Sequence, residues 1–320
     1  MFSAFLLASG LASATAGEWE WRGAIAAQID PSPHGVFDVG ARRGAFSAQL
    51  LTDTLDVRWA PELDRGRWWV AARGEFGAAG LLISPWSDGA PDPSRALTAS
   101  YGGVEGGGIR YLPRGLYAGG QLAARYYLFS AMDATTAPVP EARLLSTPEG
   151  IVGYWQESLQ GWVRGGANVG PALFSPHVAA EVKARPDWTV APRVELRAGA
   201  GMDQDYLTST RVGGLNPYVV PLAGAGWAEF WVEDYAAARV GPEGRVPLAG
   251  GALVLGAMAD LVAFRTFEQE EDAAVGLAAT AQWRKERWSV EGSWGYAPWL
   301  ERQEGVSPMA GWLSVGIDFP

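Results

Sequence analysis

The sequence predicts an all-β fold, an antiparallel transmembrane barrel of about twelve strands. Three observations predict it. Apolar and polar residues alternate with a period of two over many segments, as in strands with one apolar and one polar face. Gly, Trp and Tyr are abundant, at 42, 16 and 10 of 320 residues, whereas charged residues make up only 19%. Small residues ease bends and close packing in strands, and Trp and Tyr favour the boundary between lipid and water.

The C-terminal strand shows the alternation most clearly. Its polar positions are Ser314, Gly316 and Asp318, and its apolar positions are Leu313, Val315, Ile317 and Phe319. A terminal apolar strand with a final aromatic residue resembles the last strand of bacterial outer-membrane β-barrels, although Pro320 follows the aromatic residue here. The resemblance implies residence in the outer membrane, insertion by its assembly machinery, and contact with the bilayer and lipopolysaccharide.

Composition narrows the possible partners and chemistry. The net charge is −10 and no concentrated basic face is apparent, which argues against nucleic acid as a partner. The chain has no cysteine, which excludes a disulfide scaffold and thiolate chemistry. Two distant histidines without ligand-spaced acids do not indicate a metal site. We therefore expect neither a metal nor a cofactor.

The first residues resemble an export signal. Residues 1–16 contain a short apolar stretch and end in Ala14-Thr15-Ala16, a small-x-small pattern that a signal peptidase accepts. We expect residues 17–320 to form the barrel as one domain. The longest other apolar run, 248–264, contains Asp260 and many small residues, so it is a poor membrane helix.

The N-terminal half is expected to hold five strands, at residues 21–29, 36–59, 68–82, 96–112 and 116–130. The second of these is long for one strand, and Arg42-Arg43-Gly44 can be a bulge or a hairpin. We interpret it as a bulge. Residues 131–168 can be one long loop with a short helix capped by Thr147, or a pair of strands.

The C-terminal half is expected to hold seven strands, at residues 178–184, 190–198, 227–240, 246–264, 275–283, 288–296 and 309–319. The total is then twelve, or fourteen if residues 36–59 or 131–168 contain an additional pair. Membrane barrels of bacteria have even strand numbers. A secreted sandwich or propeller is the rival fold, but no blade repeat is apparent and the outward faces carry few charges.

Connections separate by length in this topology. Tight turns are expected at residues 60–66, 113–115, 186–187, 241–245 and 285–287, and long connections at residues 84–94, 131–168, 202–225, 265–273 and 299–308. If the C-terminus lies in the periplasm, all the tight turns are periplasmic and all the long loops are outside.

Charged side chains alternate with the outward apolar residues and are expected to line the lumen. The candidates are Arg73, Glu75, Arg110, Arg125, Glu181, Lys183, Arg185, Arg193, Glu195, Arg197, Glu229, Glu233, Arg239, Arg284 and Glu291. Arginines that face carboxylates across neighbouring strands stabilise the wall, and they either line a narrow pore or fill the lumen and close it.

Two weaker resemblances concern activity. A hydrolase triad could be formed from Ser175, His177 and Glu181, which share one face of a strand. Outer-membrane phospholipase A has a His and a Ser two positions apart, but in the reverse order. The Gly-rich segment 212–222 is faintly similar to segments in barrels of outer-membrane assembly factors, whose Arg-Gly-aromatic loop motif is missing here.

The sequence therefore favours a narrow channel or transporter for small solutes, without catalytic residues. The main alternative is a structural or assembly barrel without a pore, which binds a partner through its outer loops. A lipid-modifying hydrolase is the third hypothesis. An acidic run, Glu268 to Asp272, is either a solvated loop tip or a site for divalent cations that bridge lipopolysaccharide.

Overall fold

The computed structural model describes most of the chain from Trp19 to Phe319. The described ranges are 19–28, 34–52, 54–63, 65–75, 81–83, 86–87, 90–215, 219–226, 228–300 and 306–319. The predicted signal, residues 1–16, lies outside them. No helix among these residues is long and apolar enough to cross a membrane.

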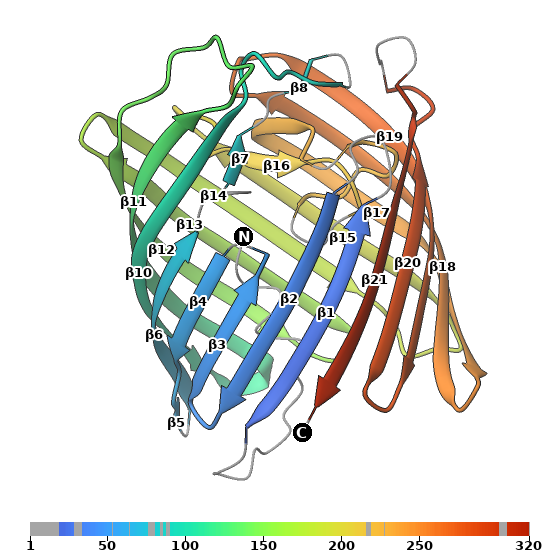
Figure 1. Ribbon diagram of the computed structural model, residues 1–320. Coiled ribbons are helices and arrows are strands. Elements are labelled where there is room, and N and C mark those ends of the chain that lie inside the picture. Colours follow the sequence, from blue (N-terminus) through green and yellow to red (C-terminus); the bar gives the residue numbers. More distant parts are fainter. Residues whose placement is uncertain are drawn as a thin grey trace.

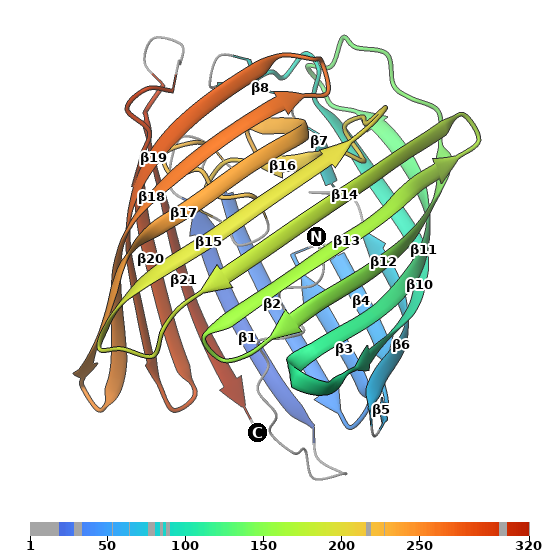
Figure 2. The same cartoon turned by 180° about the vertical axis from the view of Figure 1, so that it is seen from behind.

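Sixteen strands of the described chain pair in a closed antiparallel ring (Figures 1 and 2). They are β1 (Glu20–Gln28), β2 (His34–Arg43), β3 (Phe46–Leu51), β4 (Thr54–Trp59), β6 (Gly66–Glu75), β10 (Leu97–Tyr111), β11 (Leu116–Ala131), β12 (Arg143–Trp155), β13 (Leu159–Gly170), β14 (Leu173–Ala184), β15 (Val190–Gly201), β17 (Phe230–Leu248), β18 (Gly251–Thr266), β19 (Glu271–Lys285), β20 (Trp288–Tyr296) and β21 (Met309–Phe319). The first and last strands close the ring, with Trp21 opposite Phe319. The predicted barrel is present, but the predicted count of twelve or fourteen strands is wrong.

Shorter elements extend this wall. They are β5 (Glu62–Leu63), β7 (Leu81–Ile83), β16 (Thr210–Val212), the hairpin of β8 (Trp86–Ser87) and β9 (Ala90–Pro91), and a 3-10 turn at Pro113–Gly115. Strands β5 and β7 pair at the edges of β6 and β10, respectively, whereas β16 pairs with β17.

Two of the missing strands lie in residues 36–59, where we predicted one bulged strand. The chain instead forms β2, β3 and β4. Gly44 lies between β2 and β3 with a φ of 56°, so this is a true hairpin turn that glycine adopts without strain. The turn from β3 to β4 is equally tight, with Leu51 opposite Thr54, and lacks Gly and Pro. The sequence offers only Asp53 there, a weaker turn signal than Gly or Pro.

The other two strands lie in residues 131–168. The chain forms β12 and β13 there, so both the single long loop and the helix capped by Thr147 are wrong. Pro148 lies inside β12, opposite Leu122 of β11. On the β13 side, the pairing passes from Ser146 to Glu149 without partners for the two residues between them. A proline fits a strand where its missing N–H interrupts no hydrogen bond, and this gap provides such a place.

The predicted turn at residues 241–245 is also wrong, because β17 continues through it to Leu248. Pro242 lies opposite Pro192 of β15, so neither residue needs an N–H to pair there. The turn follows at Ala249 and Gly250, which have φ values of 52° and 76°. Proline and glycine therefore indicated a turn where the strand only passes a local gap in its hydrogen bonding.

The two rims of the barrel differ in their connections. The rim that carries the C-terminus has the turns after β2, β10, β12, β17 and β19, and we call it the turn rim (Figure 1). The opposite loop rim carries the longest connections, including residues 132–142 and 202–229. The short connections from β3 to β4 and from β13 to β14 also lie on the side of the loop rim, the first of them below the rim itself because Leu51 pairs with Asp38. The separation by length is therefore not complete.

Apolar side chains cover the outside of the barrel. Ile25, Val104, Leu122, Val152 and Phe174 are each 56–67% exposed, although such residues are normally buried. They come from five different strands around the ring. In the C-terminal strand Leu313 is 47% exposed and shares its face with Val315 and Ile317, while the side chain of Phe319 lies outside the described structure. A lipid bilayer is the solvent that suits this surface.

Candidate functional site: the barrel lumen

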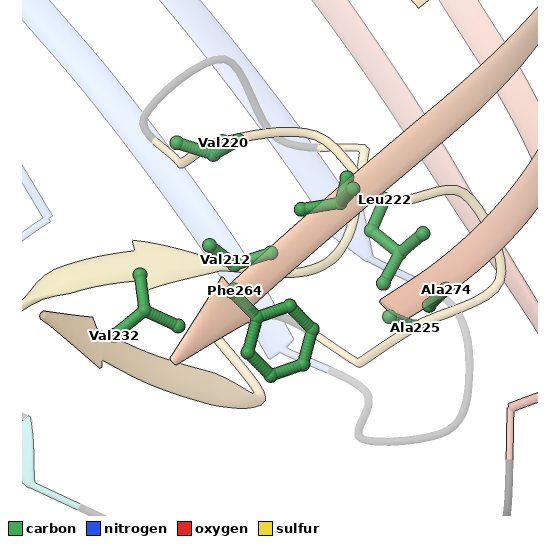
Figure 3. Packing of buried hydrophobic residues seen from close by; sticks show 8 residues of the cluster. Val212, Val220, Leu222, Ala225, Val232, Phe264 and Ala274 are labelled. Carbon is green, nitrogen blue, oxygen red and sulfur yellow. The ribbon is translucent and has the colours of Figure 1, made fainter. Parts of the chain in front are cut away.

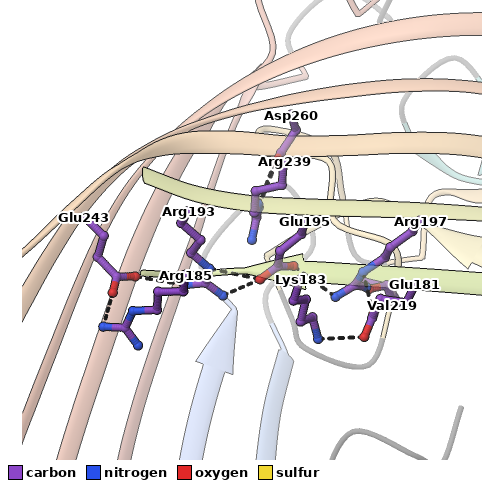
Figure 4. A network of polar contacts seen from close by, with 10 residues as sticks. All are labelled: Glu181, Lys183, Arg185, Arg193, Glu195, Arg197, Val219, Arg239, Glu243 and Asp260. Atoms are coloured by element: carbon purple, nitrogen blue, oxygen red, sulfur yellow. Dashed lines mark hydrogen bonds and ion pairs between the residues drawn. The ribbon is translucent and has the colours of Figure 1, made fainter. Parts of the chain in front are cut away.

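A charge ladder lines one part of the lumen, on β14, β15, β17 and β18 (Figure 4). Strand register places opposite charges face to face, with Glu181 opposite Arg197 and Lys183 opposite Glu195. The next strand continues the pattern with Arg239 opposite Glu195. Opposite charges directly across an antiparallel pair stabilise the sheet. We name this region the ladder wall.

Each carboxylate of the ladder wall contacts at least one cation. Arg197 contacts Glu181 at 2.9 Å and Glu195 at 3.3 Å. Arg193 contacts Glu195 at 2.6 Å and Glu243 at 3.2 Å. Glu195 and Glu243 are buried, at 3% and 5% exposed. Burial of carboxylates at this level requires such partners, so the ladder neutralises itself.

The ladder wall ends at a buried ion pair and, near the turn rim, at partly exposed cations. Arg239 donates two hydrogen bonds to the carboxylate of Asp260, at 2.6 and 2.7 Å, and Asp260 is fully buried. This fork-to-fork geometry is the strongest form of an arginine–carboxylate contact. Lys183 contacts Glu181 at 2.9 Å, and Arg185 pairs with Glu243 while its side chain remains 48% exposed.

Other predicted lumen residues lie on the remaining strands. Arg73 contacts Asp56 at 2.7 Å, and Glu105 binds Arg58 at 2.7 Å and Arg125 at 3.5 Å. These pairs connect β4, β6, β10 and β11 as the ladder connects later strands. The acidic members Asp56 and Glu105, and the cation Arg58, were not among the predicted residues. Their inward parity is the signal that could have identified them, once the strand boundaries in this part of the chain are correct.

The last predicted candidates differ in position. Glu75 and Glu229 are buried, and Glu229 precedes β17 rather than lying within a strand, where it accepts a hydrogen bond from the Gly226 amide at 2.6 Å. Glu233 accepts one from Gln269 at 3.0 Å. Arg110 is exposed on the outward parity that it shares with Val104, so it does not face the lumen.

A segment from the loop rim folds into the barrel between β15 and β17. We call residues 202–226 the inserted segment; 202–215 and 219–226 are described. Figures 1 and 2 both show its strand β16 within the outline of the barrel wall. The segment pairs with itself, with Val212 beside Val220 and Gly214 opposite Leu222. It is therefore a folded unit.

The inserted segment forms an apolar core with the barrel wall (Figure 3). Val212, Leu222 and Ala225 are fully buried and pack in one cluster with Val232, Val262, Phe264 and Ala274 of β17, β18 and β19. A second cluster joins Leu215 and Ala223 to Met258, Ala278 and Trp312. The partly buried residues around this second cluster include Ala26 of β1 and Val36 of β2.

The first part of the segment reaches a different side of the barrel. Tyr206 and Leu207 pack against a cluster of Leu97, Ala99 and Trp231, near Phe129 of β11. The inserted segment thus contacts strands from opposite parts of the ring. Most contacted residues lie in the half of their strand nearer the loop rim, and Met258 and Ala278 lie at the middle of theirs. The segment therefore crosses the lumen between the loop rim and mid-height.

Polar contacts also fix the inserted segment. Asp260, already paired with Arg239, accepts a hydrogen bond from the backbone N–H of Ala223 at 2.9 Å. Arg211 is 9% exposed and lies 3.4 Å above the ring of Trp231, where it also donates to the carbonyl of Tyr206. Burial lowers the pKa of Arg211 because the charged form loses its hydration. Stacking on Trp231 offsets part of that cost.

Glycines allow the segment to approach the wall closely. A Cβ on Gly276 of β19 would lie 2.4 Å from the carbonyl oxygen of Ala223, and one on Gly295 of β20 would lie 2.6 Å from the amide of Gly224. Gly224 itself has a φ of 84°. Only glycine permits contacts this close between backbones, so the binding surface for the segment is built into the wall.

His177 has partners other than those of the hydrolase hypothesis. Its Nε2 lies 2.9 Å from Glu149, and its Nδ1 lies 3.5 Å from the side-chain amide of Asn168. The hydroxyl of Ser175 is fully buried and has no hydrogen-bond partner among the described residues. Glu181 binds Lys183 and Arg197 instead. These contacts link His177 of β14 to β12 and β13 in the lumen wall.

Known structures share this architecture, whereas sequence comparisons find no relative. No protein-family model matches the chain, and no curated protein does. CdiB from Acinetobacter baumannii is similar with a TM-score of 0.70 and 9% identity, over 95% of this chain and 60% of that one. BamA from Haemophilus ducreyi gives a TM-score of 0.67 at 8% identity, over 93% and 70% of the two chains. CdiB from Escherichia coli gives 0.68 at 12% identity, over 95% and 64%.

The closed barrel and its similarity to these structures together give the class of the protein. The chain is an outer-membrane β-barrel, as the terminal strand predicted, because the closed ring, the apolar exterior and the charged interior occur together in that class. It spans about 60% of the length of the first CdiB protein. At identities of 8–12%, the likeness concerns the fold alone.

Proposed function

We propose that this outer-membrane barrel is a transport passage for small solutes, held closed by the inserted segment. One observation carries the proposal. A folded segment with its own apolar contacts crosses the lumen near the loop rim, while charged side chains toward the turn rim remain exposed to solvent. Barrels of sixteen to eighteen strands enclose an interior wider than side chains fill. Closure of such a passage needs an inserted element, and residues 202–226 supply one.

The half of the lumen near the turn rim supports this proposal. Arg284 of β19 and Glu291 of β20 have inward parity and are exposed. On the ladder wall, the side chains of Arg185 and Arg193 are 48% and 36% exposed. Exposed charges on inward faces indicate water in this half of the barrel. A hydrated vestibule that ends at an apolar inserted segment is the geometry of a closed passage.

Single-channel recording in a planar bilayer tests the proposal. We would compare the refolded mature chain with a variant in which a short Gly-Ser linker replaces residues 213–226. Wild type is expected to be silent or to show brief small steps, and the deletion is expected to give sustained steps several times larger. Heat-modifiable migration on a gel would verify that each barrel is folded. A folded deletion variant with wild-type conductance would disprove closure by this segment.

A matched control shortens another connection at the same rim. Residues 133–141 join β11 and β12 and include no member of the apolar clusters that hold the inserted segment. Their removal is expected to leave conductance at the wild-type level. Sustained opening in this control would show that any loss at the loop rim opens the barrel.

The loop rim favours one alternative, a barrel without a pore that binds a partner through its outer loops. Arg95 contacts Glu268 at 2.6 Å, and Arg143 pairs with Asp205, so separate connections join at this rim. The Thr136 amide also donates to the Ser94 carbonyl at 2.9 Å. Joined loops offer a partner one continuous surface. Electrical silence in both wild type and the folded deletion variant would favour this alternative.

A further inference from the structure

A partly enclosed cavity lies in the lumen wall, and its lining includes no described residue of the inserted segment or of the ladder wall. Its volume is about 80 Å³, and residues of β4, β6, β10, β11, β12 and β13 line it. Tyr111 and Tyr117 place it toward the turn rim, since they flank the turn at Pro113–Gly115. This space exceeds that of one water molecule several times.

Aromatic side chains form the walls of this cavity because glycines lie beneath them. A Cβ on Gly107 would lie 2.6 Å from the ring of Trp69, and one on Gly153 would lie 2.3 Å from the ring of Tyr117. Both rings therefore lie flat against the sheet. Trp69 is 8% exposed and Tyr117 is 5% exposed. Arg58 lies 5.9 Å over the ring of Trp69, so the ring of Tyr117 presents the apolar wall, of the kind found in most small-molecule sites.

The cavity has hydrogen-bond donors without protein partners. The indole nitrogen of Trp69 is buried and has no hydrogen-bond partner among the described residues. Nε of Arg164 is also buried without a hydrogen-bond partner among the described residues. Its guanidinium lies 5.2 Å above the ring of Trp162. Buried polar groups are normally satisfied, so these two donors indicate an acceptor that occupies the cavity.

Other cavity groups are already engaged, which fixes the charge of the missing acceptor. Arg58 and Glu105 form a pair at 2.7 Å. Glu149 accepts from Gln121 at 2.5 Å and contacts His177 at 2.9 Å. Arg164 has no carboxylate within ion-pair distance among the described residues, although it is close enough to Glu149 to act on its charge. The lining as a whole carries three arginines, Arg58, Arg67 and Arg164, and two carboxylates, Glu105 and Glu149, so its formal charge is +1. The complement is a group with one negative charge.

We propose that this cavity binds a carboxylate-bearing sugar, a uronic acid unit. The carboxylate accepts from Arg164 and from the indole N–H of Trp69. One face of the sugar ring lies against the flat ring of Tyr117, because the guanidinium of Arg58 already lies 5.9 Å over the ring of Trp69. Glu149 and Gln121 at the edge of the cavity meet the hydroxyl groups, while the rest of the ligand projects into the lumen. Aromatic faces with a few fixed polar groups are the arrangement that orients such a ligand.

Isothermal titration calorimetry of the refolded mature chain in detergent tests the site without any need for a conducting pore. The probe is sodium glucuronate, and glucose and sodium acetate are the comparison ligands. Glucuronate is expected to bind more tightly than either one, since only it has both the carboxylate and the ring. Absence of binding, or equal binding of glucose or of acetate, would overturn the proposal.

Two substitutions and a control locate the binding. Arg164→Gln is expected to weaken glucuronate roughly 10-fold or more, the usual effect of losing a charged hydrogen-bond donor. Trp69→Phe keeps the ring and removes the N–H, with a loss of roughly 3- to 10-fold expected. Arg284→Gln removes an inward cation on the distant strand β19 and should leave affinity unchanged. Equal losses in all three variants would show that general lumen charge, not this cavity, attracts the ligand.

Discussion

The ladder wall and the wall of β10–β13, which we call the glycine-rich wall, accommodate polar side chains inside the barrel in different ways. Both face the lumen and both carry polar side chains. On the ladder wall, register puts a cation opposite a carboxylate, as in Glu181 opposite Arg197. On the glycine-rich wall, Trp69 and Tyr117 lie flat over Gly107 and Gly153. Charges that pair with one another are not available to bind a ligand, whereas flat rings leave space and hydrogen-bond donors for one.

The inserted segment uses a third combination of these devices. Asp260 completes the ladder through Arg239 and also holds the Ala223 amide. Glycines at 276 and 295 accept the backbone of the segment, as Gly107 and Gly153 accept rings. The inserted segment is thus attached to the wall both by a charged pair and by glycines. Substitutions of the paired charges and substitutions of the glycines should therefore lower the free energy of unfolding by different amounts.

The largest effect is expected from Asp260→Leu. This change leaves Arg239 buried without its partner and the Ala223 amide without its acceptor. Breaking a buried ion pair by removal of one member costs about 3–5 kcal/mol. Guanidinium unfolding of the refolded barrel in detergent should show a loss of this order, and the inserted segment should become sensitive to protease before the wall unfolds.

The matched control for that prediction is the double variant Arg239→Met with Asp260→Leu. Replacing both members by apolar residues removes the uncompensated charge, and such replacements are often neutral or stabilising. The unpaired Ala223 amide still costs about 1–3 kcal/mol. Recovery of part of the lost stability is therefore expected. A double variant as unstable as the single one would mean that the ion pair is not what Asp260 contributes.

A smaller effect is expected from Gly153→Ala on the glycine-rich wall. The new methyl group would lie 2.3 Å from the ring of Tyr117, which must leave its place. Overpacking of this kind costs about 1–3 kcal/mol of the free energy of unfolding. Gly102→Ala in β10 is the control, because a Cβ there meets nothing within 4 Å. Equal stability of the two variants in guanidinium titration would contradict the role of glycine beneath the ring.

The sequence predicted the class of fold and most inward faces, because period-two alternation is a local property. It underestimated the number of strands where turns lack a strong signal, as at Leu51 and Thr54, and where proline lies inside a strand, as at Pro148. Arg110 shows a further limit, since a shift of one residue moves a side chain from one face to the other. Local alternation also carries no information on contacts such as Tyr117 with Gly153, which depend on register between strands.

The inward path of the inserted segment could not be predicted from the sequence, for a related reason. Residues 202–226 have the composition of an outer loop, rich in Gly and Pro, and no local pattern states that a loop turns inward. Asp260 was the one available indication, as a lone charge in an otherwise apolar run. The role of Asp260 becomes clear only in the structure, where its carboxylate accepts a hydrogen bond from the Ala223 amide, 37 positions earlier in the chain.

The smallest effect is expected from Lys183→Gln on the ladder wall. Lys183 contacts Glu181 at 2.9 Å with its side chain 30% exposed, but Glu181 keeps Arg197 at the same distance. A partly exposed pair whose acid retains a second cation contributes about 0–1 kcal/mol. The free energy of unfolding should therefore change by less than about 1 kcal/mol. A loss as large as that of Asp260→Leu would show that the ladder acts as one cooperative network, in which case the two walls differ less than their contacts indicate.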